Sequence, residues 1–242
     1  MKCPSVMPTI LLLVLLFTCI LTLGAASANP HAQIVEHLLA LHDPADVTNA
    51  LPEIATLWPD QSHAYTQCVT HILNILTAAP ANEVVVQASR RMFANVATNS
   101  IPWDHEDSSS LLRLRCQLTH QCLNVPLIRT DISTWLVIAS TLGQVRSRIV
   151  PNYMKQGQLN PPNLMHASSQ EEAQRARAEN QKKIATDRLQ LELRVADREL
   201  KLLLLTSMKE ASSSLNKPQR GQFIARIKSL ARLNEEEARQ LE

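Results

Sequence analysis

Two cysteine–histidine pairs are the residues of this sequence whose types and spacing point most directly to chemistry. Cys68 and His71 are three residues apart, and Cys116 and His120 are four residues apart. On a helix each pair would share one face, so two facing helices could offer zinc a shell of two thiolates and two imidazoles. This interpretation predicts metal binding, although the spacing matches no known zinc module.

The same cysteines are also candidates for a disulfide. Cys116 and Cys122 are six residues apart, which on a helix separates them by a rise of about 9 Å and points them about 240° apart. A disulfide needs Cα atoms within roughly 7 Å, so these two are not expected to bond each other. We expect Cys68 to pair with Cys122, since both lie on apolar faces. Cys68–Cys116 is the alternative, and one thiol is left over.

Other chemistry-bearing patterns are sparse. The stretch "WDHEDSSS" gathers Asp104, His105, Glu106 and Asp107, which could bind a metal or do acid–base work. We expect instead a solvated loop whose acids favour the N-terminus of the next helix. The G-x-S-x-G, H-E-x-x-H, Walker A and G-x-G-x-x-G motifs are missing. This disfavours an enzyme and predicts no cofactor, although catalytic residues far apart in the sequence would leave no such motif.

The first 28 residues have the layout of a secretory signal peptide. One lysine precedes an apolar run over about residues 10–23, and the small residues Ala26, Ser27 and Ala28 follow. We expect cleavage after Ala28 and a secreted or periplasmic protein. An uncleaved signal anchor is the alternative, because the run approaches the roughly 18–20 residues that span a bilayer. Export would place the cysteines in an oxidising compartment.

The composition favours an all-α fold and gives no case for nucleic-acid binding. The chain carries 24 Lys and Arg against 22 Asp and Glu, so it lacks the basic excess that nucleic-acid binding needs. Only Gly143, Gly157 and Gly221 follow residue 28, whereas turn-rich β folds and phosphate-binding loops depend on glycine. All eight histidines precede residue 168, and the segment after it is denser in charge, which predicts two structural units.

Apolar residues recur at helical spacing through residues 29–150. The segments are about 31–42, 61–79, 82–99, 107–125 and 130–150, with a weaker helix over 45–57 that we expect to break near Pro52. Asn82 is a candidate cap. Five or six helices predict a multi-helix domain, built either as stacked hairpins in the manner of an α-solenoid or as an irregular bundle. No recurring signature of a helical repeat was found to decide between them.

Residues 151–168 are rich in proline and polar residues and predict a linker, after which residues 169–242 predict a long helix followed by a helical hairpin. Ser169 with Glu172, and Asn234 with Glu237, fit capping boxes. The long helix carries a coiled-coil-like seam on one face and a second apolar face of Leu191, Val195, Leu202 and Leu205. It therefore needs more than one neighbour.

These patterns together predict an exported, non-enzymatic interaction or scaffold protein. It would bind a protein partner, or a second copy of itself, through the apolar stripes of its C-terminal helices. The alternatives are a peripheral membrane protein that uses the basic amphipathic segment 219–233 and a metal-binding protein or metal-dependent enzyme built on the Cys/His pairs. The expected contact residues are Leu189, Leu193, Leu200, Leu203, Phe223, Ile227 and Leu230.

Overall fold

The part of the chain that the structure describes is helical and contains no strand, which confirms the expected all-α class. The computed structural model describes residues 30–151, 153 and 170–241. The expected signal peptide, the Ser169 cap and almost all of the expected linker lie outside these residues. The helices are α2 (Pro30–Leu39), α3 (Pro44–Thr56), α4 (Ser62–Ala78), α5 (Glu83–Thr98), α6 (Ser108–Cys122), α7 (Pro126–Arg129), α8 (Ile132–Arg148), α10 (Gln170–Ser212), α11 (Lys217–Ala231) and α12 (Glu235–Arg239).

The helix ends follow local sequence signals. The Asn82 side chain accepts a bond of 2.9 Å from the Val85 amide at the start of α5. Asn234 and Glu237 form the expected capping box at α12, and Asn216 forms another with Gln219 at α11. The expected break near Pro52 is wrong, because α3 continues through it. One face of α3 stays buried on both sides of that proline, and this packing outweighs the lost backbone bond.

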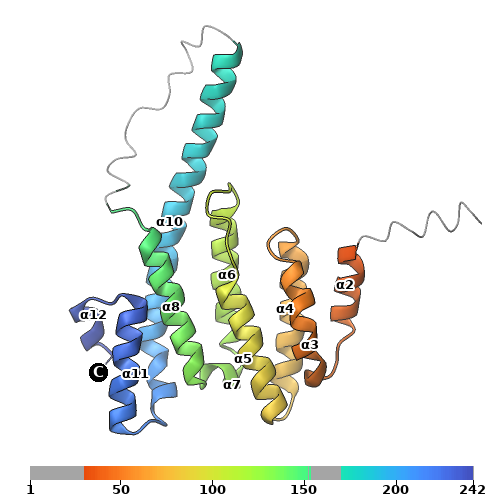
Figure 1. The fold of residues 1–242 in the computed structure, drawn as a ribbon, viewed down its shortest axis with the longest axis vertical. Coiled ribbons are helices and arrows are strands. Elements are labelled where there is room, and N and C mark those ends of the chain that lie inside the picture. Colours follow the sequence, from red (N-terminus) through yellow and green to blue (C-terminus); the bar gives the residue numbers. More distant parts are fainter. Residues whose placement is uncertain (1–29, 152, 154–169, 242) are drawn as a thin grey trace, which may run out of the picture. The chain divides into compact units, whose positions relative to one another are not determined.

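Residues 41–242 form one compact unit of two helix layers, and α2 belongs to the other unit. In the first layer α3 packs on α5, α5 on α8 and α8 on α11; in the second α4 packs on α6 and α6 on α10. Contacts between α3 and α4, α5 and α6, and α8 and α10 join the layers, so Figure 1 shows successive helical hairpins side by side. This is the stacked-hairpin arrangement of an α-solenoid.

The long helix α10 completes this stack instead of founding a domain of its own. It packs against α8 in its own hairpin and against α6 in the neighbouring one, while α11 packs on α8. The division that the sequence suggested at residues 151–168 is therefore not a boundary between compact units. Composition does change there, but the buried face of α10 is covered by helices that precede the change.

Two aromatic side chains bind the C-terminal end of α5. Trp58 comes from the loop before α4, and Tyr65 comes from α4. Trp58 Nε1 donates to the Ser100 carbonyl at 2.7 Å, and its ring meets that of Tyr65 edge-on, with the centroids 5.2 Å apart. The Tyr65 hydroxyl donates to Asn95 Oδ1 at 2.8 Å and accepts from Asn99 Nδ2 at 2.7 Å. Both aromatic residues are buried, so these bonds satisfy groups that would otherwise lack a partner.

Helices α8 and α11 approach so closely that one position must be glycine. A Cβ atom on Gly143 would overlap the carbonyl oxygen of Leu230 in the last turn of α11. The other described glycine, Gly221, has nothing within 4 Å of the position that a Cβ would take. Gly143 is thus required by backbone packing, whereas Gly221 only weakens its own helix.

Arg146 of α8 is the polar centre of the C-terminal half. Its guanidinium lies 2.6 Å from Asp197 of α10 and 2.8 Å from Glu237 of α12. It also donates to the Arg232 carbonyl at 2.9 Å, at the left-handed residue that ends α11. One side chain therefore holds three other helices and neutralises the negative end of the α11 dipole.

We expect Gly143→Ala to destabilise the protein by about 1–3 kcal/mol, because the added methyl overpacks a backbone contact between two helices. The matched control is Gly221→Ala, which should stabilise the protein by about 0.5–1 kcal/mol through helix propensity. Urea unfolding followed by circular dichroism measures both. Equal effects of the two substitutions would contradict the close α8–α11 approach.

We expect Glu237→Gln to lower the free energy of unfolding at pH 7 by about 1–2 kcal/mol, because it removes the charge that faces Arg146. The Arg146 hydrogen bond, the largest cause, lowers the pKa of Glu237 from 4.5 to about 2. Because the pKa is lowered in the folded state, the ionised Glu237 side chain stabilises the fold above pH 4.5. This contribution to stability is lost as the pH falls from 4.5 to about 2. The variant should therefore show a shallower loss of stability over that range.

The matched control for this measurement is Glu236→Gln, since Glu236 is exposed in the same helix turn. It should leave the acid limb of the stability curve unchanged. Identical pH profiles for the Glu237 variant and the parent chain would show that the Arg146 pair contributes nothing.

Candidate functional site

The three described cysteines are separate buried thiols. Cys68 and Cys122 are fully buried, Cys116 is 5% exposed, and none is bonded to another. The expected Cys68–Cys122 disulfide, and its Cys68–Cys116 alternative, are therefore not formed, because the residues do not lie close together. Burial raises the pKa of the Cys116 thiol to about 11 and that of Cys122 to about 12, and it also raises the pKa of Cys68. Protonated thiols are poor nucleophiles and poor ligands.

The zinc shell that was the alternative to a disulfide is not assembled among the described residues. Over the described ranges, no three His, Cys, Asp or Glu side chains are grouped so that they could hold a metal ion. His71 Nε2 lies 2.9 Å from the Leu41 carbonyl oxygen and its ring meets that of His42 edge-on. His120 instead faces outward from α6. The helical spacing makes two pairs, but the fold does not bring the pairs together.

Most of the residues expected to contact a partner are used inside the chain. Leu193 and Leu200 of α10, and Phe223 and Ile227 of α11, are buried, while Leu189, Leu203 and Leu230 are half-buried. The seam of α10 thus packs on the preceding helices, and the stripe of α11 packs on α8. These residues stabilise the monomer, so a partner would have to use other side chains.

The second apolar face of α10 is the one left uncovered. Three of its four residues are exposed, Leu205 is half-buried, and Ile184 extends the exposed row toward the N-terminus. We call the exposed side chains the outer stripe: Ile184 (58%), Leu191 (49%), Val195 (42%) and Leu202 (60%). Their separations of seven, four and seven residues place them within about 20° of one direction on the helix. The exposed Arg188 and Arg198 lie between these apolar residues. An exposed apolar row of this kind marks an interaction surface more often than isolated apolar residues do.

Polar anchors on both sides of α10 hold the outer stripe toward solvent. On the α8 side, the Gln190 amide accepts from the Val150 amide at 3.0 Å and donates to the Arg148 carbonyl at 3.1 Å. Asp197 adds the ion pair with Arg146. On the α6 side, Glu192 pairs with Arg113. Because rolling α10 would break all of these bonds, the exposed face is fixed by tertiary contacts.

A groove runs beside the outer stripe between α6 and α10. One hollow of about 360 Å³ and a second of about 430 Å³ share Gln117 and Glu199 in their walls, so they are parts of one depression. Leu191 and Val195 face the first hollow, and Leu202 faces the second. The remaining walls come from Leu112, Arg113, Cys116, Glu192 and Ala196 in the first and from His120, Leu203 and Thr206 in the second.

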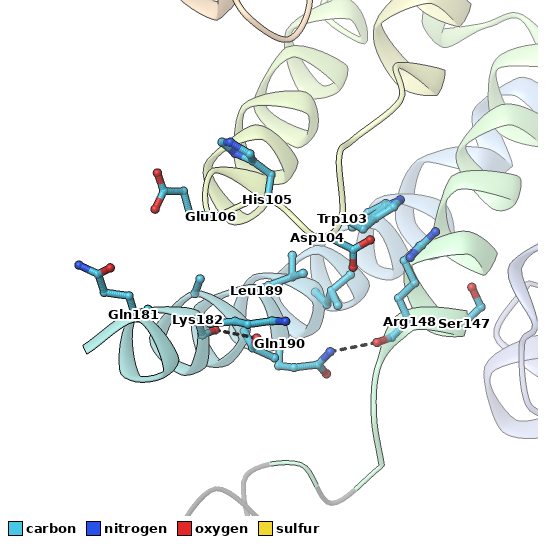
Figure 2. A pocket seen from close by; sticks show the side chains of 14 residues that line it. Trp103, Asp104, His105, Glu106, Ser147, Arg148, Gln181, Lys182, Leu189 and Gln190 are labelled. Atoms are coloured by element: carbon cyan, nitrogen blue, oxygen red, sulfur yellow. Dashed lines mark hydrogen bonds between the residues drawn. The ribbon is translucent and has the colours of Figure 1, made fainter. Parts of the chain in front are cut away.

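A larger cleft of about 760 Å³ lies between the loop before α6, the end of α8 and α10. Figure 2 shows Trp103 and Asp104 on one side of it, Arg148 beside them, and Lys182, Leu189 and Gln190 on the α10 side. Acidic and basic side chains alternate around this cleft, so it has no single charge that would select an ion.

Trp103 in this cleft contacts two arginine side chains of the same chain. The guanidinium carbon of Arg148 lies 4.3 Å from the ring centroid and that of Arg115 lies 6.0 Å from it. Arg115 is only 3% exposed and donates one bond, of 2.9 Å, to the Asn99 carbonyl, while its Nε and Nη2 have no partner. Burial lowers the pKa of Arg115. Besides the Asn99 carbonyl, the negative face of the Trp103 ring helps to compensate this buried charge.

The acidic loop over residues 104–107 forms the turn that starts α6. The Asp107 amide donates to His105 Nδ1 at 3.2 Å, and the Ser108 hydroxyl donates to the His105 carbonyl at 2.6 Å. These bonds lie within the loop, and the side chains of His105 and Asp107 are exposed. The arrangement is that of an exposed turn that leads into α6, and the Asp107 side chain makes no capping bond to that helix.

Sequence reasoning missed the anchors, and one of them left a signal. Arg146 lies on the apolar face of α8, four residues after Leu142, which itself comes three residues after Ala139. A charged residue on a buried stripe must find a partner, and Arg146 finds Asp197 and Glu237. Gln190 and Glu192 left no comparable signal, since each is one of many polar residues on a charged helix.

Among the described residues, no helix combines the length and the apolar character needed to cross a membrane. Comparison of the chain with protein-family models, curated proteins and solved structures gave no match. Among the described surfaces, the outer stripe and its groove are the most distinctive.

We expect a thiol reagent to leave Cys68, Cys116 and Cys122 unmodified in the folded protein and to modify all three after unfolding in denaturant without reductant. The physical reason is that each thiol is free, buried and protonated. Peptide mass mapping of the labelled chain gives the answer residue by residue. If two of the three resist labelling in denaturant until a reductant is added, a disulfide exists and the free-thiol arrangement is wrong.

Proposed function

We propose that the protein is an exported, non-enzymatic helical interaction protein that binds a protein partner along the groove between α6 and α10. The observation that carries the proposal is the outer stripe. Four large apolar side chains stay 42–60% exposed on a helix whose other apolar face is buried or half-buried against its neighbours. Covering such a face removes apolar surface from water and stabilises a complex by about 25 cal/mol per Å² of that surface. This favours a binding partner.

The shape of the partner follows from the geometry of the groove. The outer stripe spans residues 184–202, which is about 27 Å of helix at 1.5 Å per residue. A straight apolar ridge beside a long groove fits an amphipathic helix laid along it. Stacked helical hairpins commonly present such extended surfaces to their partners. We therefore propose a helical partner.

Export is the second part of the proposal. It is supported by the lysine, apolar run and small residues of the first 28 residues. In a secreted or periplasmic protein the partner would be another exported protein.

No observation favours a membrane surface as the partner. That alternative needs the apolar stripe of α11, and Phe223 and Ile227 are already buried in the fold. The exposed residues of α11 around them are largely basic and polar, and a basic face without an apolar one binds membranes only weakly.

We expect a photo-crosslinking amino acid at position 202 to give a crosslinked product in the producing cells, because Leu202 is 60% exposed beside the groove. The matched control places the same amino acid at position 84, since Val84 is also apolar and 48% exposed but lies on α5. Electrophoresis and mass spectrometry of the product identify what was crosslinked. Cell fractionation of the same chain tests export.

Two results would contradict the proposal. If positions 191, 195 and 202 all give no product above that of position 84, the groove is not an interaction surface. If the chain remains in the cytosol with residues 1–28 intact, the export part of the proposal is wrong.

A further inference from the structure

The residues of the outer stripe are spaced symmetrically about residue 193. Ile184 and Leu202 lie nine residues to either side of it, Leu191 and Val195 lie two residues to either side, and Arg188 and Arg198 lie five residues to either side. On a helix all six point within about 40° of one direction. A two-fold axis at residue 193 would therefore bring each member of the stripe opposite its counterpart in an antiparallel copy.

We propose that the partner of the groove is a second copy of this chain, bound antiparallel through α10 about a two-fold axis at residue 193. This inference rests on the proposed function and names the occupant of the same surface. In the pair, Ile184 meets the second copy's Leu202, and Leu191 meets the second copy's Val195. Every exposed apolar side chain of the stripe is then covered by another, which is the self-complementarity that a two-fold interface requires.

The charges that flank the stripe complement one another in this pairing. Arg188 lies about 40° to one side of the stripe, and Glu199 lies about 60° to the same side. The two-fold axis puts the Arg188 of one copy level with the Glu199 of the other, within about one residue rise. Arg198 and Asp187 are related in the same way on the opposite side of the stripe. The dimer thus gains two Arg188–Glu199 pairs and two Arg198–Asp187 pairs.

These charges are available for such pairs. Arg188, Arg198 and Glu199 are exposed, and within the described ranges none of them has an ion pair in its own chain. Asp187 is half-buried and also bonds the hydroxyl of Tyr153. The Arg188–Glu199 pair therefore depends on the second copy alone, and it is the better one to test.

A parallel pairing of the same helices would also cover the stripe, but it would exchange the charge partners. It would set Arg188 level with the second copy's Asp187, and Arg198 level with its Glu199. Exchanging the charges of Arg188 and Glu199 therefore distinguishes the two pairings, because the exchange restores opposite charges only in the antiparallel one.

The experiment is sedimentation equilibrium on the purified full chain over about 1–100 µM, at low and high salt. We expect a monomer–dimer equilibrium that weakens with salt. Arg188→Glu and Glu199→Arg should each raise the dissociation constant about tenfold or more, because each sets like charges against each other twice. The double variant R188E/E199R restores opposite charges and should return the dissociation constant to within about threefold of the parent value.

Two further variants separate loss of the interface from loss of the fold. Leu191→Glu should abolish the dimer, whereas Val84→Glu, which places the same charge at an exposed position of α5, should leave it intact. Thermal unfolding by circular dichroism confirms that each variant is folded. A chain that stays monomeric at every concentration overturns the inference, and so does a double variant that dimerises no better than the single ones.

The outcome also separates this inference from the proposed function on which it rests. A monomeric chain that crosslinks from position 202 to a different protein contradicts the proposed dimer but still supports the proposed interaction surface. A monomeric chain with no crosslink from the groove overturns both. A crosslinked product that contains two copies of this chain supports both.

Discussion

The guanidinium of Arg146 is the point on which the C-terminal half of the structure depends. It joins α8 to Asp197 of α10, to Glu237 of α12 and to the last carbonyl groups of α11. Its side chain is only 16% exposed, so an unpaired charge there would be costly. These connections to three helices hold only when the helices take one arrangement. Gly143, three residues earlier, permits the same arrangement by letting α11 approach.

This arrangement decides what α10 can offer to a partner. The helix has two apolar faces, and the fold buries the one that carries Leu193, Leu200 and Leu204. Asp197 and Gln190 tie its flank to α8, and Glu192 ties the other flank to α6. The helix is thereby prevented from rolling, and the outer stripe remains the exposed face. The polar anchors therefore determine which face is exposed. Without them, either of the two apolar faces of α10 could be the buried one.

The buried thiols and the Trp103 cluster belong to the stability of the fold. The three cysteines fill apolar space in α4 and α6 as small side chains. Trp103 lies against two guanidinium groups, one of which is almost fully buried with two nitrogens unpaired. The cysteines drew attention in the sequence because of their chemical type, whereas the Trp103 cluster was not expected from it. In the structure they are explained by packing and by the need to compensate a buried charge, and this leaves the α6–α10 groove as the surface that we propose binds a partner.

The sequence by itself determined the all-α class, the approximate helix ranges, the caps at Asn82 and Asn234 and the presence of two apolar faces on the long helix. These follow from contacts between residues three or four apart, which local spacing encodes. Only the tertiary structure decided that Leu193, Leu200, Phe223 and Ile227 face inward, that the cysteines stay apart and that α10 completes the preceding stack. Helical periodicity tells which residues share a face. Which face is buried depends on side chains such as Arg146, more than forty residues from its partner Asp197, and on the close approach at Gly143, so it is decided only when distant segments pack.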